Sequence, residues 1–136
     1  MTDSNTSPPP PNRERLGDER TGRTYAFRLR QTREDGQQET VKFYFTINTY
    51  GDGRPGEVFI RADRQGSFVS GVLDVLGIMI SLGLQHGVPL EIIIEKMKGT
   101  RFPPASFTGN KLVSNCTSPL DLLARLLEAE FLPKEP

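Results

Sequence analysis

The stretch Gly66–Lys98, GSFVSGVLDVLGIMISLGLQHGVPLEIIIEKMK, decides how this chain folds. Its apolar residues recur at steps of three and four as far as Leu84 and again after Pro89, which predicts two helices joined by a tight turn. We expect the hydroxyl of Ser67 to cap the first helix, and Gly87 to take the left-handed position after its last turn. Because the first helix is apolar nearly all round, it should be covered on several sides by a sheet, another helix or a second subunit.

The composition describes a small chain of balanced charge, with 136 residues, 17 basic and 17 acidic side chains, and one cysteine. This length predicts one domain, at residues 23–132, between a polar, proline-rich tail at 1–22 and a short tail at 133–136. The net charge of zero gives no electrostatic reason to expect nucleic acid or an anionic membrane as main partner. Nothing at the N-terminus resembles a signal peptide, and the apolar stretch Val69–Leu84 is shorter than a usual membrane span. We therefore expect a cytoplasmic protein.

Three segments of alternating apolar and polar residues precede the helices. They begin near Tyr25, Val41 and Glu57, and turn-forming residues at 34–36 and 51–56 separate them. The pattern predicts an antiparallel meander of about three strands whose apolar face lies against the first helix. The apolar positions of these strands are Tyr25, Phe27, Leu29, Val41, Phe43, Phe45, Ile47, Val58 and Ile60.

The region after the helical pair should be a loop followed by a last helix, which completes an α+β fold. We expect Phe102 and Phe107 to pin the polar loop to the core. Ser118 should cap the last helix with Pro119 in its first turn, and Asp121 places negative charge near the helix N-terminus. The apolar stripe of this helix is predicted to be Leu120, Leu123, Leu127 and Phe131.

Several short motifs occur in one order along the chain. They are GDGRPGEVFI, GS-x-x-SG-x-x-D, LQHGVPLE, TRF-x-P, FTGN and S-x-x-D-x-x-x-R-x-L. Together they resemble the C-terminal domain of adenosylcobalamin-dependent (class II) ribonucleotide reductases, often called a TSCPD domain. The resemblance covers roughly Arg13 to Phe131. The chain departs from that pattern at Pro103, where the family has an acidic residue, and at Pro119, Leu122 and Ala124 in the last helix.

The resemblance implies that this chain corresponds to one domain of a reductase and lacks the parts of that enzyme that catalyse the reaction. In that family a large barrel holds adenosylcobalamin and the catalytic residues, and a cysteine pair on a mobile tail re-reduces the site. This chain is too short for the barrel and has only Cys116, whereas reduction of a ribonucleotide takes two electrons from a dithiol. We therefore expect no catalytic residue here, no cofactor bound by this chain alone, and no catalysis on its own.

A candidate anion site lies where the third strand leads into the first helix. Free amides and the helix dipole there favour phosphate or carboxylate, and Gly66 would let an anion approach the backbone closely. Lys98 and Arg101 would lie nearby if the second helix returns antiparallel. The alternative is an ordinary helix start with solvated arginines. The full candidate set is Arg61, Arg64, Gly66, Ser67, Lys98 and Arg101.

Three further residues are single candidates with structural alternatives. Asp74 should be exposed or paired with an arginine such as Arg101, because an unpaired buried carboxylate is costly. His86, the one histidine, has no catalytic partner in any motif and would favour the helix C-terminus when protonated. Cys116 lacks neighbours at metal-ligand spacing, so we predict no metal site and a half-buried packing role.

These observations leave three functions open. The first is a non-catalytic, stand-alone module that binds a nucleotide or docks on a reductase. The second is an oligomeric, nucleotide-sequestering protein independent of any reductase. Small residues of the first helix suggest that a sheet or the same helix of another copy packs very close, with core packing and an oligomer interface at even odds: Gly71, Gly77, Ser81 and Gly83. Because so apolar a helix occurs in so small a chain, we expect at least a dimer. The third is a small enzyme acting on phosphate esters through Asp74, His86 and arginines, although it lacks a nucleophile and base set.

Overall fold

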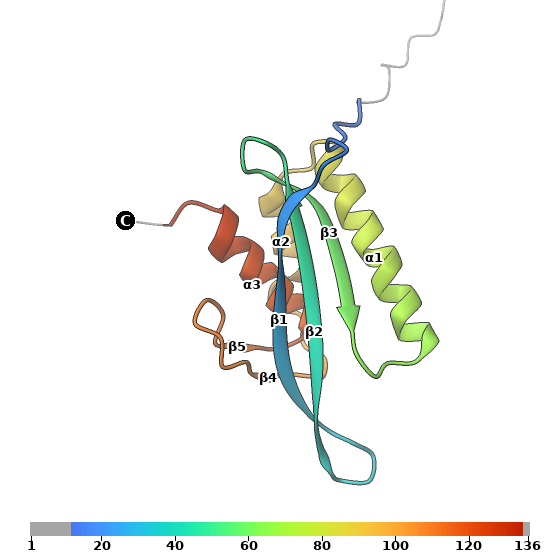
Figure 1. The fold of residues 1–136 in the computed structure, drawn as a ribbon. Helices are drawn as coiled ribbons and strands as arrows, with labels where there is room; N and C mark the ends of the chain where they lie inside the picture. Colours follow the sequence, from blue (N-terminus) through green and yellow to red (C-terminus); the bar gives the residue numbers. More distant parts are fainter. Residues whose placement is uncertain (1–11, 135–136) are drawn as a thin grey trace, which may run out of the picture.

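The computed structural model describes residues 12–134 and confirms the α+β fold (Figure 1). Its elements follow in the order β1 (Thr21–Thr32), β2 (Gln38–Thr49), β3 (Pro55–Ala62), α1 (Ser67–Gln85), α2 (Leu90–Met97), β4 (Ser106–Phe107), β5 (Asn115–Cys116) and α3 (Pro119–Phe131). Residues 1–11 of the tail predicted at 1–22 lie outside the described residues.

The three long strands form an antiparallel sheet in the order β1-β2-β3. Phe45 at its centre lies opposite Tyr25 on one side and Ile60 on the other. Because side chains alternate between the two faces of a strand, this register collects the predicted apolar positions on one face. Eight of the residues on that face are buried to 5% exposure or less: Phe27, Leu29, Val41, Phe43, Phe45, Ile47, Val58 and Ile60.

The helix that buries the most side chains is α3. Each of its residues Leu122, Leu123, Ala124, Leu126 and Leu127 has no exposed surface. Ile94 and Met97 of α2 join the same core, and α2 packs on α3. The apolar face of the sheet is therefore covered chiefly by the C-terminal helix rather than by the first one.

Helix α1 runs along the outer edge of β3 (Figure 1). Gly77 faces the strand so closely that an added Cβ would lie 2.9 Å from the carbonyl oxygen of Val58. One turn later, the Ser81 hydroxyl accepts a hydrogen bond of 2.8 Å from the Val58 N–H, and the Gln85 amide donates one of 2.9 Å to the Gly56 carbonyl. The helix thus satisfies backbone groups that an edge strand would otherwise leave unpaired. The expectation that a helical glycine marks close packing against the sheet holds at Gly77.

Substitution of Ser81 by alanine should show how much this contact with the strand edge contributes to the stability of the domain. The Val58 N–H would stay buried without an acceptor, so we expect the free energy of unfolding to fall by about 2 kcal/mol. Urea denaturation followed by circular dichroism measures the change, and hydrogen exchange should accelerate most at Val58. Ser70→Ala, at an exposed position of the same helix, is the control and should change stability by less than about 0.5 kcal/mol. Equal effects of the two substitutions would contradict this role of Ser81.

The predicted turn between the first two helices is confirmed. His86 is the C-terminal cap of α1, Gly87 follows with φ of +86°, and the Val88 N–H donates back to the Gly83 carbonyl over 2.9 Å. The predicted N-terminal cap is wrong. Gly66 occupies the cap position, and Ser67 begins the helix without a capping hydrogen bond from a side chain.

The prediction that two phenylalanines pin the loop after α2 is also wrong. Phe107 is 80% exposed and Phe102 is 43% exposed. Val113 and Cys116 enter the core instead, and the loop closes on itself through the Phe102 N–H and the Thr117 carbonyl at 3.1 Å. Polar contacts at the start of α3, described below, hold the two ends of this loop.

The structure places residues before 23, the predicted domain boundary, against the domain. The Glu14 N–H donates to the Gln85 carbonyl over 2.8 Å, and the Glu14 carboxylate forms an ion pair of 2.8 Å with Arg54. Tyr50 donates its hydroxyl to the Glu14 carbonyl over 2.6 Å. The segment from Glu14 onward is therefore part of the folded unit.

Candidate functional site

Arg61, Arg64, Gly66 and Ser67 lie between the end of β3 and the first turn of α1, as the sequence predicts. The Arg61 guanidinium lies over the ring of Tyr44, 4.6 Å from its centroid. Arg64 adopts φ of +55°, which turns the chain from strand to helix. Gly66 and Ser67 are exposed. The arginines and the helix start are thus adjacent along the chain, with Arg61 directed to the sheet face opposite the core.

The structure does not bring Lys98 and Arg101 to this corner. Lys98 forms an ion pair with Glu128 of α3, with nitrogen–oxygen distances of 2.8 and 2.9 Å. Arg101 lines a separate hollow beside the ends of β1 and β2, together with Thr32 and Gln38. Because α3 covers the core face of the sheet and Arg61 lies on the opposite face, the six predicted residues do not form one site.

Asp74, His86 and Cys116 lie in three different surroundings. Asp74 is exposed, and no ion pair joins it to Arg101 or to any other residue between 12 and 134. The His86 ring nitrogen Nδ1 lies 2.9 Å from the Leu82 carbonyl at the end of α1. Cys116 is buried, more fully than predicted, and burial raises the pKa of its thiol. Within the described residues no cluster of three potential metal ligands occurs.

The carboxylate that organises this end of the molecule is Asp121, which the sequence indicated only as a favourable charge at a helix start. It is fully buried and accepts hydrogen bonds from the Gly99 N–H at 2.7 Å, the Thr117 N–H at 3.0 Å and Arg125 Nε at 2.9 Å. Burial alone would raise the pKa of Asp121, but these hydrogen bonds outweigh it and hold the pKa below its ordinary value. Ser118 caps α3 as predicted, accepting from the Asp121 N–H over 2.8 Å. This network is structural, because each of its polar groups has a partner within the protein.

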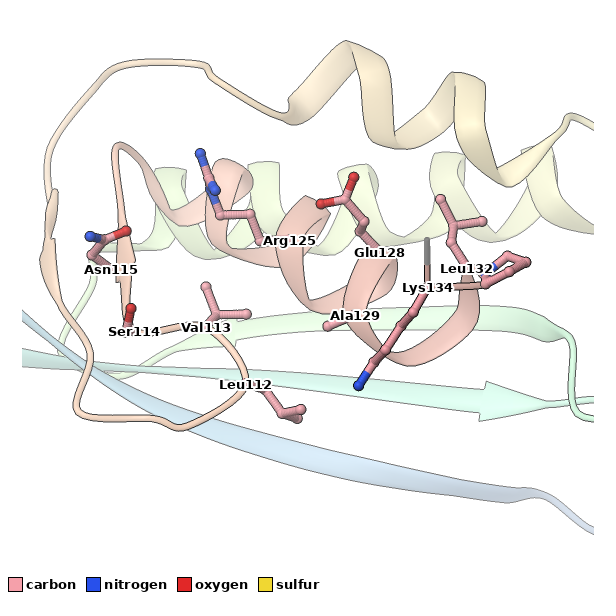
Figure 2. A pocket seen from close by; sticks show the side chains of 10 residues that line it. Leu112, Val113, Ser114, Asn115, Arg125, Glu128, Ala129, Leu132 and Lys134 are labelled. Carbon is pink, nitrogen blue, oxygen red and sulfur yellow. The ribbon is translucent and has the colours of Figure 1, made fainter. Parts of the chain in front are cut away.

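A hollow of about 530 Å³ lies between α3 and the loop that precedes β5 (Figure 2). Figure 2 shows Arg125 and Glu128 on the α3 side and Leu112 and Val113 on the loop side. Arg125 is already bonded to Asp121, and Glu128 to Lys98. Lys134 also lines the hollow and has no ion-pair partner among residues 12–134, so it is the one charged side chain there that is left for a ligand.

The side of α1 that faces away from β3 is exposed and apolar, which corrects the expectation that this helix is covered on several sides. Phe68 is 82% exposed. We call the exposed residues the α1 face: Phe68, Val69, Val72, Val75, Ile78 and Met79. By length and composition α1 is also apolar enough to cross a membrane, although in this structure Ser81 and Gln85 bond it to β3. An exposed apolar patch of this kind usually marks an interaction surface.

The sheet face opposite the core is open and carries positive charge. Arg28 and Lys42 lie directly opposite each other on β1 and β2, and Arg61 of β3 shares their face. The sequence showed this alternation of cations with core residues, but the net charge of zero hid their concentration on one face. We call the following residues the open sheet face: Thr24, Arg28, Arg30, Lys42, Tyr44, Thr46, Phe59 and Arg61.

Comparison with known proteins identifies the domain. The family model of the TSCPD domain matches residues 20–131. The chain belongs to the TSCPD domain family. This TSCPD domain is 38% identical over 122 residues to a vitamin B12-dependent ribonucleotide reductase of Rhodopirellula baltica, covering 90% of the chain and 11% of the relative.

Two further relatives carry the same name. The TSCPD domain is 42% identical over 92 residues to the vitamin B12-dependent ribonucleotide reductase of Streptantibioticus cattleyicolor, covering 68% of the chain and 15% of that protein. It is 41% identical over 100 residues to the one of Agrobacterium fabrum, covering 71% and 8%. The chain thus spans a small part of the relatives it matches, and the predicted resemblance is confirmed. No solved structure matches this chain.

Proposed function

We propose that this chain is a non-catalytic interaction module that docks through the α1 face on the polypeptide of a B12-dependent ribonucleotide reductase in the cytoplasm. The α1 face is the observation that carries the proposal. In its relatives the matching region is 8 to 15% of a much longer protein, where neighbouring parts are at hand to cover such a face.

The physical reason for docking is the cost of leaving the α1 face in water. Each large apolar side chain contributes about 1.5–3 kcal/mol when it is fully buried. Phe68, Ile78 and Met79 are each more than half exposed, so a partner that covers them would gain several such contributions. Residues on the other side of α1 hold the helix to β3, which keeps the face preformed for a partner.

The proposal assigns no catalysis to the chain by itself. Its one cysteine, Cys116, is buried in the core and its raised pKa disfavours the thiolate. Asp74 lies in the middle of α1 and His86 caps its C-terminus, and no hydrogen bond joins the two side chains. The arrangement therefore favours binding over the hydrolysis of a phosphate ester.

Docking can be tested with the reductase of Rhodopirellula baltica from which the region matching this chain has been deleted. We expect the purified chain to bind the deleted form more tightly than the full-length form, measured by biolayer interferometry. Phe68→Glu combined with Ile78→Glu should weaken binding about ten-fold or more, because both charges would enter an apolar interface. Phe107→Glu is the matched control, since Phe107 is as exposed as Phe68 but lies on β4.

Two results would contradict docking on a reductase. One is equal binding by the α1 double variant and the Phe107→Glu control. The other is a native mass showing a homo-oligomer that the α1 double variant converts to monomer, with no affinity for the reductase. That second result would assign the α1 face to another copy of this chain, as in the sequestering alternative.

A further inference from the structure

The open sheet face holds a row of cations that the protein itself leaves unpaired. Arg28 and Lys42 face each other across β1 and β2, and Arg30 follows one step further along the same face. Like charges directly opposite each other destabilise an antiparallel pair. No ion pair joins any of the three to a carboxylate within residues 12–134. Their arrangement suits an anionic partner that extends along the sheet.

Flat groups suitable for stacking lie on the same face, next to these cations. The Arg61 guanidinium covers the Tyr44 ring, so its outer plane is presented to solvent. Phe59, on the same strand as Arg61, is 52% exposed. Nucleic-acid bases stack on aromatic rings and on guanidinium planes. The hydroxyls of Thr24 and Thr46, 2.8 Å apart, lie beside these groups.

Two walls turn the open sheet face into a trough. On the β3 side, Asp74 and Ile78 of α1 border a hollow of about 570 Å³ above Tyr44 and Phe59. On the β1 side, the segment 105–109 borders a hollow of about 630 Å³ above Arg28 and Arg30. The stacking groups thus lie at one wall, and the cations extend toward the other.

We propose that this trough binds single-stranded nucleic acid, with bases stacked on Phe59 and the Tyr44–Arg61 pair and phosphates bound by Arg28, Arg30 and Lys42. The cations are spread over two strands instead of converging on one point, which favours a chain of phosphates over the phosphates of one nucleotide. Three acidic side chains lie at or beside this face. Asp74 is at the β3 wall, on the side of the bases, Glu57 is paired with Arg20, and the Asp63 carboxylate accepts a hydrogen bond from the Lys42 N–H.

Fluorescence anisotropy with a labelled oligothymidylate of about 12 nucleotides tests the proposal on the full chain. We expect a Kd on the order of micromolar at about 50 mM salt. In a plot of the logarithm of the binding constant against the logarithm of salt concentration, each phosphate contact should contribute about −0.7 to the slope. Arg28→Ala with Lys42→Ala should weaken binding about ten-fold and lower the slope by about 1.4. Phe59→Ala should weaken binding about ten-fold and leave the slope unchanged. An oligouridylate of the same length shows whether the strand is DNA or RNA.

Matched variants separate this trough from general charge and from the α1 face. Lys96→Ala removes an exposed cation from α2, and it should leave affinity and slope unchanged. Phe68→Glu with Val72→Glu, two α1-face positions that do not line the trough, should retain the salt slope, and unfolding midpoints confirm that each variant is folded. The proposal is overturned if no binding is detected at about 100 μM protein, or if Lys96→Ala and the double alanine variant lose the same affinity. It is also overturned if a blunt duplex binds with equal affinity, or if free thymidine triphosphate competes as well as the unlabelled oligonucleotide.

Discussion

Asp121→Ala is expected to lower the free energy of unfolding by about 3 kcal/mol, the largest loss from a single polar side chain in this domain. The substitution would leave the Gly99 and Thr117 N–H groups without their acceptor and would remove the partner of Arg125. Arg125 is partly exposed and can be resolvated, so the two backbone donors account for most of the loss. Urea denaturation followed by circular dichroism gives the change.

A matched control is Asp52→Ala, which removes a carboxylate paired with Arg54 where both side chains are more than half exposed. Surface pairs of this kind contribute little, so the unfolding midpoint should not move measurably. Similar losses for the two substitutions would show that Asp121 is not the point that joins the loop to α3.

The pH dependence of the unfolding free energy should also report the contribution of Asp121. The folded-state pKa of Asp121 is lowered relative to about 3.9 for an unfolded aspartate, so its contribution is complete above that value and is lost as pH falls through the folded pKa. The difference in unfolding free energy between the unmodified chain and Asp121→Asn should therefore shrink below about pH 4. A difference that stays constant from neutral pH to about pH 2 would contradict this assignment.

Gly77→Ala should destabilise the domain by about 2 kcal/mol, although alanine is the better helix former by about 1 kcal/mol. The new Cβ would lie 2.9 Å from the Val58 carbonyl oxygen, and a backbone atom of a paired strand cannot move aside cheaply. Gly77→Leu should cost more and detach α1 from β3. Thermal unfolding together with hydrogen exchange of the β3 amides measures both effects.

The sign of the effect should reverse at Gly71 on the same helix. Nothing in the described part of the chain lies within 4 Å of a Cβ added there. Gly71→Ala should therefore stabilise the domain by up to about 1 kcal/mol through helix propensity and reduced freedom of the unfolded chain. A loss of stability at Gly71, or a gain at Gly77, would contradict the packing of α1 against the strand edge.

The strands and the turn after the first helix could be predicted because local sequence determines them. Alternation at Phe43, Phe45 and Ile47 defines a face of a strand whatever the strand packs on. The positive φ of Gly87 is likewise a local requirement. Such features depend on near neighbours along the chain, and the structure has them where the sequence predicts them.

The depth at which each helix is buried could not be predicted, because it depends on partners distant in sequence. An apolar helix such as α1 suggests a buried centre, yet its residues Phe68 and Met79 are exposed while α3 fills the core. An apolar surface is expected to be covered, but its sequence does not identify whether the same domain or another protein covers it. The role of Asp121 was missed for the same reason, since its donor at Gly99 is 22 residues away.

The candidate site shows the same division. Arg61, Arg64 and Gly66 lie close together along the chain because a predicted strand runs into a predicted helix, and the structure has both elements. The expected return of Lys98 required knowledge of how α2 packs, and α3 holds that residue instead. The open sheet face depends on pairing register, which places Arg28 beside Lys42 only once the hairpin is formed.

Helix α1 divides its two tasks between opposite sides. A narrow row of residues holds the helix against β3: Gly77, Ser81 and Gln85. The residues that face outward make no such contact with the sheet. Substitutions on the outer side can therefore accumulate with little risk of unfolding the chain. A family built on this scaffold can change what it recognises by altering one side of a single helix while inheriting the rest intact.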